Sequence, residues 1–157
     1  MPAVLFVCTG NLYRSPISAA LFNAILVQKQ ADLSAWRVES AGTWAQADQP
    51  SPPEVLQAMA KRGLDLTSYR SRMVSAEILA EFDLILTMES GQKEALCIEF
   101  PKIARRVFML SEMAGSQVSI SDPIDRSVDG VGDVALEIED WLTRGKDRIF
   151  QLVQFKG

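Results

Sequence analysis

Hydrophobic residues in this chain fall into two patterns that alternate from the N-terminus onward. Short apolar runs, typical of buried parallel strands, occupy residues 3–7, 83–88 and 107–110, and residues 36–41 alternate like a further strand. Apolar residues at helical spacing predict helices that begin at residue 15 and that span 54–62, 75–82, 92–100 and 133–155. Strands that alternate with helices imply an α/β fold with a doubly wound parallel sheet and helices on both faces. The 157 residues are expected to form one domain, 1–157.

The junction between the first strand and the first helix carries the most informative residues. Cys8 ends the apolar run, and Arg14 follows it after five intervening residues. Gly10 and Asn11 lie in this gap, and they are the two residue types that most readily adopt positive φ angles. We therefore expect the backbone to curl into a tight loop between Cys8 and Arg14.

A helix is expected to begin immediately after this loop. Ser15 is favoured as an N-cap and Pro16 at the first helical position, so the helix N-terminus should face the loop. The N–H groups of a curled loop and of a helix N-terminus bind phosphate, and they stabilise a thiolate. Arg14 can bind two phosphate oxygens, and the Ser15 hydroxyl can donate to the sulfur of Cys8. The stretch predicts a nucleophile that faces a phosphoryl group, although a cysteine at a strand end is also a common small core residue.

Composition excludes several classes of catalysis and of binding partner. The net charge of −4 and the pI near 4.9 argue against nucleic acid or an anionic membrane surface as a principal partner. The sequence has no histidine, which excludes Cys-His and Ser-His catalysis and the usual zinc sites. No cofactor is expected, and no metal is required where Arg14 and the loop N–H groups stabilise the phosphoryl charge. Two cysteines do not make a disulfide framework, and with neither a signal peptide nor a long apolar span the protein is expected in the cytoplasm.

The loop resembles the active-site loop of the low-molecular-weight protein tyrosine phosphatases, which reads C-x-G-N-x-C-R-S. The matching residues are Cys8, Gly10, Asn11, Arg14 and Ser15, and Tyr13 stands in place of the second cysteine. The resemblance covers essentially the whole chain. It implies a four-stranded sheet in the order 2-1-3-4, with the phosphate-binding loop after strand 1 at the switch point, where open α/β sheets bind ligands.

The resemblance also implies a reaction. Members of the family hydrolyse phosphotyrosine in protein substrates through a phosphocysteine intermediate and release inorganic phosphate, without a metal. It implies Cys8 as the nucleophile, Arg14 as the phosphate clamp and Asp122, in an Asp-Pro pair, as the general acid and base. The residues expected to bind phosphate or to support the loop are Thr9, Gly10, Asn11, Leu12, Tyr13 and Ser15.

The resemblance also implies roles for further residues, and for most of them a purely structural role is an alternative. Trp44 follows the sequence S-A-G-T at 40–43, which the family carries at a strand end, and it is either an aromatic wall of the cleft or a filler beside the core. Ile124 could line the cleft, and Glu89 is expected to be a rim charge or a helix cap. Tyr69 stands where relatives have a loop-supporting histidine, and its hydroxyl could act as the donor or be solvated.

Three other functions stay open. An arsenate reductase of the same fold would need further cysteines for a disulfide relay, and only Cys97 remains. Phosphoarginine phosphatases resemble this loop but carry threonine after the asparagine, whereas Leu12 offers an apolar wall suited to an aryl ring. A non-catalytic phosphopeptide-binding module would not need both Cys8 and Asp122. Because Tyr13 replaces the second cysteine, peroxide is expected to inactivate the protein less reversibly than its two-cysteine relatives.

Overall fold

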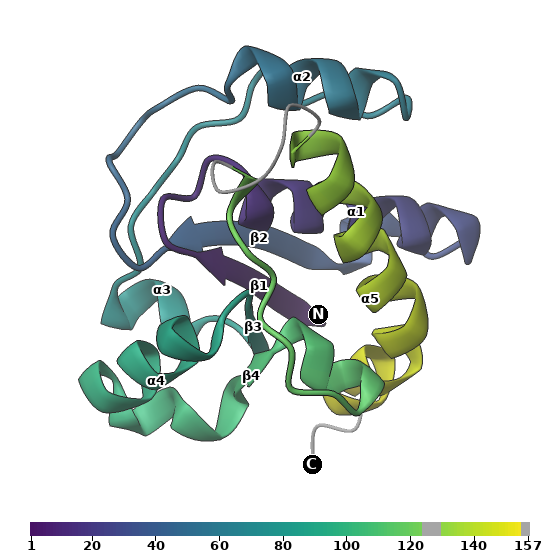
Figure 1. Cartoon of the computed structure of the whole chain (residues 1–157). Coiled ribbons are helices and arrows are strands. Elements are labelled where there is room, and N and C mark those ends of the chain that lie inside the picture. Colours follow the sequence, from purple (N-terminus) through teal and green to yellow (C-terminus); the bar gives the residue numbers. More distant parts are fainter. Residues whose placement is uncertain (124–129, 155–157) are drawn as a thin grey trace.

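A parallel sheet forms the centre of this computed structural model, which describes residues 1–123 and 130–154 (Figure 1). Its strands are β1 (Ala3–Cys8), β2 (Arg37–Gly42), β3 (Leu84–Thr87) and β4 (Val107–Met109), in the order β2-β1-β3-β4. The predicted parallel sheet and its strand order are therefore confirmed. The apolar runs follow from this arrangement, since parallel strands covered on both faces are buried throughout.

Helices lie on both faces of the sheet (Figure 1). One face is covered by α1 (Arg14–Gln28), α2 (Pro53–Ala60) and α5 (Gly130–Gln154), and the other by α3 (Ala76–Ala80) and α4 (Ser90–Glu99). The short 3-10 helices η1 (Leu33–Ala35), η2 (Pro101–Arg106) and η3 (Leu110–Ala114) lie between these elements. In the part of the chain that the structure describes, no helix combines the length and the apolar character needed to cross a bilayer.

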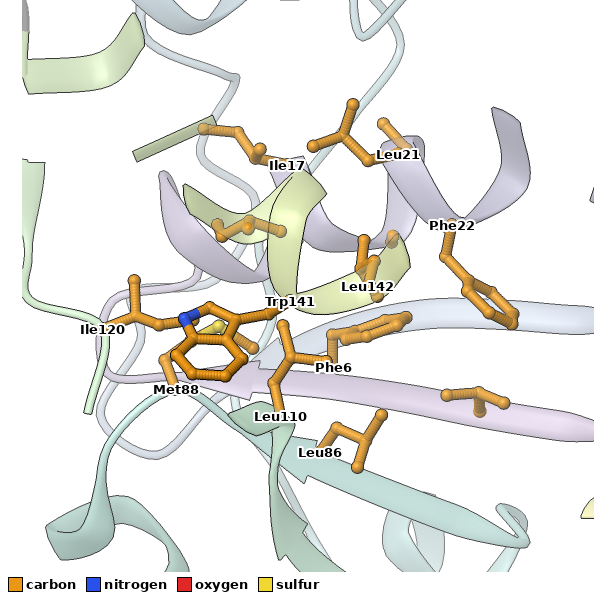
Figure 2. Close-up of a cluster of buried hydrophobic side chains, with 14 of the residues drawn as sticks. Phe6, Ile17, Leu21, Phe22, Leu86, Met88, Leu110, Ile120, Trp141 and Leu142 are labelled. Carbon is orange, nitrogen blue, oxygen red and sulfur yellow. The ribbon is translucent and has the colours of Figure 1, made fainter. Parts of the chain in front are cut away.

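Alternate side chains of β1 enter two separate cores. The even-numbered residues from 4 to 8 pack with α1, α2 and α5, and the odd-numbered residues from 3 to 7 pack with α3 and α4. Figure 2 shows the first core, where Phe6 and Leu86 of the sheet meet Trp141 and Leu142 of α5. The strand period of two thus places Cys8 on the side of the sheet where α1 begins.

The carboxyl ends of the central strands meet at one edge of the sheet. The register pairs Cys8 with Gly42 of β2 and Val7 with Thr87 of β3. The chain leaves β1 towards α1 on one face and leaves β3 towards α4 on the other face. The point between β1 and β3 is therefore a topological switch point, which is where open α/β sheets bind ligands.

The helix boundaries differ from the expected ones by up to three residues. Helix α1 begins at Arg14 rather than at Ser15, and its N-cap residue Tyr13 makes no side-chain capping hydrogen bond. Ser15 does not cap the helix because its hydroxyl lies against Cys8 Sγ inside the loop. Helix α5 begins at residue 130, earlier than predicted, whereas the predicted last position, 155, and the predicted cleft residue Ile124 lie outside the described residues.

Candidate active site

The candidate nucleophile lies at the buried end of β1. Cys8 is 2% exposed, and its Sγ lies 3.0 Å from Ser15 Oγ and accepts from the backbone N–H of Asn11 at 3.3 Å. Because Asn11 Nδ2 donates to Ser15 Oγ at 2.9 Å, the serine proton turns towards Sγ, its nearest acceptor. Two donors beside a helix N-terminus form an environment that stabilises a thiolate.

Asn11 holds the loop in its curled shape. It is fully buried, and its φ of 60° lies in the left-handed region, as predicted. Its side chain donates to Ser15 and Ser40, and its Oδ1 accepts from the backbone N–H of Arg72 at 2.8 Å. Gly10, the other residue type in the loop that readily adopts a positive φ, does not take one here. One left-handed residue is enough to reverse the chain in this short loop.

Tyr69 supports the same loop from the neighbouring segment. Its hydroxyl donates to the carbonyl oxygen of Asn11 at 2.7 Å and lies 3.2 Å from Ser40 Oγ. Burial raises the pKa of Tyr69, so the phenol stays protonated and remains a donor. The donor role expected at the position of the family's histidine is therefore confirmed, and the solvated alternative is wrong.

Gly42 allows β2 to approach the loop closely. An added Cβ would lie 2.4 Å from the carbonyl oxygen of Thr9 and 3.0 Å from Asn11 Cβ, so a side chain does not fit. The next two backbone N–H groups donate to the carbonyl oxygens of Cys8 and Thr9 at 2.9 and 3.0 Å. The glycine of the S-A-G-T sequence is required for this close approach between backbones.

Arg14 is 2% exposed and is held by two acceptors from distant segments. Its Nη1 donates to Glu89 Oε2 at 2.6 Å and to the carbonyl oxygen of Ile120 at 2.8 Å. Its Nη2 lies 3.5 Å from Asp122 Oδ2. The two Nη1 bonds fix the plane of the guanidinium, whose Nη2 side faces Asp122. A guanidinium held in one plane is suited to bidentate contact with an anion.

The structure brings together most of the predicted site residues. The Asp122 side chain reaches Arg14 and is 34% exposed, and Leu12, which lies between Cys8 and Arg14 in the sequence, is half-buried. Trp44 is 80% exposed, so the alternative of a filler beside the core is wrong. Its role as an aromatic wall of the cleft stays a prediction.

Tyr13 connects the loop to α2. Its hydroxyl donates to Glu54 Oε1 at 2.8 Å, which lowers the pKa of the Glu54 carboxyl. Burial, the bond to Glu54 and the charge of Asp122 together raise the pKa of Tyr13 to about 12. The residue that replaces the family's second cysteine thus ties the loop to a neighbouring helix.

Glu89 makes a contact with Arg14 that the sequence analysis did not predict. It caps α4, as one of the expected alternatives had it, but its carboxylate also fixes Arg14. A signal for this second contact was available, because Glu89 follows the end of β3 closely and Cys8 ends the adjacent β1. Carboxyl ends of neighbouring parallel strands lie at the same edge of a sheet.

These features define a class of protein: a doubly wound α/β fold that carries a curled loop, a helix N-terminus and a candidate cysteine nucleophile at its switch point. Within residues 1–123 and 130–154, no group of three or more histidine, cysteine, aspartate or glutamate side chains is placed to hold a metal ion.

Comparisons with known proteins give the family. A family model described as low molecular weight phosphotyrosine protein phosphatase matches residues 3–149. A probable low molecular weight protein-tyrosine-phosphatase, EpsP, from Ralstonia nicotianae is 32% identical over 92% of this chain and 90% of its own length. A protein-arginine-phosphatase from Bacillus subtilis is 30% identical over 88% of this chain and 91% of its own length.

Structural similarity agrees with the sequence comparisons. The crystal structure of a YwlE mutant from Bacillus subtilis matches with a TM-score of 0.86 and 28% identity, over 96% of this chain and 99% of that chain. The chain belongs to the low molecular weight phosphotyrosine protein phosphatase family. Its relatives are phosphatases, which supports a phosphatase enzyme, and they include proteins named for tyrosine and for arginine.

Proposed function

We propose that this protein hydrolyses phosphotyrosine in protein substrates, with Cys8 as nucleophile, Arg14 as phosphate clamp and Asp122 as general acid and base. The observation that carries the proposal is the contact of Arg14 with Asp122 at the sheet edge where Cys8 and Arg14 bound one short loop. Cys8 Sγ has donors from Ser15 and Asn11, and the Arg14 guanidinium lies 3.5 Å from the Asp122 carboxylate. These contacts support an assignment in which the three groups needed for cysteine-dependent phosphoryl transfer act at this edge of the sheet.

The first step transfers the phosphoryl group to sulfur. A lone pair of the Cys8 thiolate forms the S–P bond while the bond between phosphorus and the phenolic oxygen breaks. Asp122, in its acid form, gives its proton to the departing oxygen. Arg14 and the loop N–H groups stabilise the charge on the three equatorial oxygens. The products of this step are the phosphocysteine and the free tyrosine side chain.

The second step releases phosphate. Asp122 is now a carboxylate, and it accepts a proton from a water molecule whose oxygen attacks phosphorus. The S–P bond breaks, and its electron pair returns to Cys8 as the thiolate. Ser15 stabilises this leaving group because its hydroxyl lies 3.0 Å from Sγ. Inorganic phosphate leaves with the oxygen of water, and the aspartic acid is restored.

Phosphoarginine is the second candidate substrate, because a relative of almost equal identity is named protein-arginine-phosphatase. The loop favours tyrosine in this chain. Leu12 is an apolar, half-buried residue of the loop and Trp44 is an exposed aromatic residue, and we expect both to provide apolar walls against which an aryl ring packs. A guanidinium gains nothing from an aliphatic wall, since its N–H groups need acceptors.

Hydrolysis of p-nitrophenyl phosphate in the presence of EDTA tests the proposal. We expect Cys8→Ser to abolish the activity and Asp122→Asn to lower kcat by about 10²- to 10⁴-fold. Cys97→Ser and Asp147→Asn are matched controls with no expected effect, since Cys97 packs in the core on the other face of the sheet and the Asp147 side chain is 89% exposed.

Two results would redirect the proposal. An inactive parent that binds phosphate would indicate a phosphopeptide-binding module, and arsenate-dependent oxidation of thioredoxin would indicate a reductase. Paired assays on phosphotyrosine and phosphoarginine peptides test the choice of residue. We expect kcat/KM to favour phosphotyrosine by about tenfold or more, a normal range for discrimination by an apolar pocket. A preference for phosphoarginine would contradict the tyrosine assignment alone.

A further inference from the structure

Gln92 is a buried amide, 5% exposed, in the first turn of α4 beside the phosphate loop. Its Oε1 accepts from the backbone N–H groups of Met88 and Glu89 at 2.9 and 3.0 Å. Its Nε2 donates to Thr9 Oγ1 at 3.0 Å and to Glu89 Oε2 at 3.2 Å. Four hydrogen bonds use the full capacity of a primary amide. The reverse orientation would set its NH₂ group against two N–H donors, so the orientation is determined.

The two ends of this amide serve different purposes. The oxygen completes the capping box at the start of α4, which is a structural contribution. The nitrogen instead joins Thr9, in the loop, to the carboxylate oxygen that also accepts from Arg14. A helix cap needs only the acceptor. The placement of the donors therefore points to a second role.

We infer that Gln92 is a positioning residue of the active site, which holds the Glu89 carboxylate against Arg14 and ties the loop to that ion pair through Thr9. The inference rests on the proposed function of the loop as a phosphate site. Without the amide donor, the Glu89 carboxylate loses one of the groups that orient it and keeps the backbone N–H of Gln92 and Arg14 as donors. A shift of this less restrained carboxylate would move the guanidinium that it holds. A displacement of about 1 Å at such a clamp costs on the order of 10²-fold in rate.

Gln92→Glu separates the two roles. The introduced carboxylate keeps the oxygen acceptors that cap α4, but it lacks both donors and repels Glu89. At about pH 7.5 we expect kcat/KM for p-nitrophenyl phosphate to fall about tenfold or more, and inorganic phosphate to bind more weakly in calorimetry. Near pH 5, roughly where a carboxyl beside another carboxylate takes up a proton, one O–H donor returns. The deficit relative to the parent at the same pH should then shrink.

Gln92→Met distinguishes the loss of the amide donors from repulsion between an introduced carboxylate and the anionic substrate. It removes donor and acceptor without adding charge, so it is expected to lower kcat/KM at both pH values and, because the cap is lost, to lower Tm as well. The same two substitutions at Gln57, which is exposed on α2, are the matched controls. They should leave activity and phosphate affinity unchanged.

The outcomes are separable. Activity and phosphate affinity equal to the parent in both Gln92 variants would overturn the inference. A fall in kcat/KM of Gln92→Glu that is the same at both pH values would also overturn the inference. If Gln92 only capped α4, protonation of the introduced carboxyl would restore no activity. If the parent hydrolyses no aryl phosphate, the proposed function fails, and phosphate calorimetry on the parent and on Gln92→Glu still decides whether Gln92 positions the clamp.

Discussion

Removal of one hydroxyl from Tyr69 tests how the loop is held. The chain has two tyrosines, so Tyr13→Phe offers the same atomic change as a matched control. The Tyr69 hydroxyl donates at 2.7 Å to the carbonyl oxygen of Asn11, a fully buried residue with a left-handed backbone. The Tyr13 hydroxyl donates instead to the exposed carboxylate of Glu54. The two substitutions therefore remove one partly buried hydrogen bond to a fully buried residue and one exposed hydrogen bond.

The expected magnitudes differ for this reason. Tyr69→Phe leaves a buried carbonyl without this donor, which costs about 1–3 kcal/mol in the free energy of unfolding. Tyr13→Phe leaves a carboxylate that water can solvate, so its cost should stay within about 0.5 kcal/mol. Tyr69→Phe should also lower kcat/KM by about tenfold. The left-handed turn at Asn11 loses a support, so the loop N–H groups are no longer held in the orientation that binds a phosphate.

Urea unfolding followed by tryptophan fluorescence measures both variants against the parent. The midpoint should fall in Tyr69→Phe with no change in the slope m, since the surface exposed on unfolding is the same. Equal destabilisation by the two substitutions, or a cost below about 0.5 kcal/mol for Tyr69→Phe, would refute the account of the loop given above.

Three further predictions concern the same region. Because the folded protein raises the pKa of Tyr13 to about 12 and also raises that of Tyr69, the phenolate absorbance should rise later than the usual pKa near 10. The contribution of the two phenols to the free energy of unfolding should be complete below about pH 10 and should decline as the pH rises towards 12. A phenolate absorbance that rises around the usual tyrosine pKa would contradict this. Gly42→Ala places a Cβ 2.4 Å from the carbonyl oxygen of Thr9, so it should destabilise the fold by about 1–3 kcal/mol in the same urea assay and lower phosphate affinity. Unchanged stability and affinity would show that the loop backbone moves to accommodate the added Cβ. Peroxide should inactivate the enzyme with little recovery on addition of thiol, because no second cysteine lies in the loop of Cys8; full rescue after prolonged exposure would disprove it.

Local sequence determined the fold class and the candidate nucleophile. The apolar runs and helical stripes predicted the elements because burial on both faces of a parallel sheet leaves a continuous hydrophobic run. The loop was predicted equally well, since Cys8, Asn11 and Arg14 lie within seven consecutive residues and their geometry depends on short-range backbone preferences. The role of Asp122 came from the resemblance to a family, because an Asp-Pro pair alone indicates only a turn.

Tertiary structure decided how the loop is supported. Tyr69, Glu89 and Gln92 reach it from segments that are 58 to 83 residues away along the chain, and each makes its contact through a side chain. Neither hydrophobic period nor turn chemistry carries information on such a contact, because both describe neighbours in sequence. Only the packing of α4 and of the Tyr69 segment against the carboxyl edge of the sheet fixes which distant polar groups satisfy the buried loop, and that packing arises when the whole core forms.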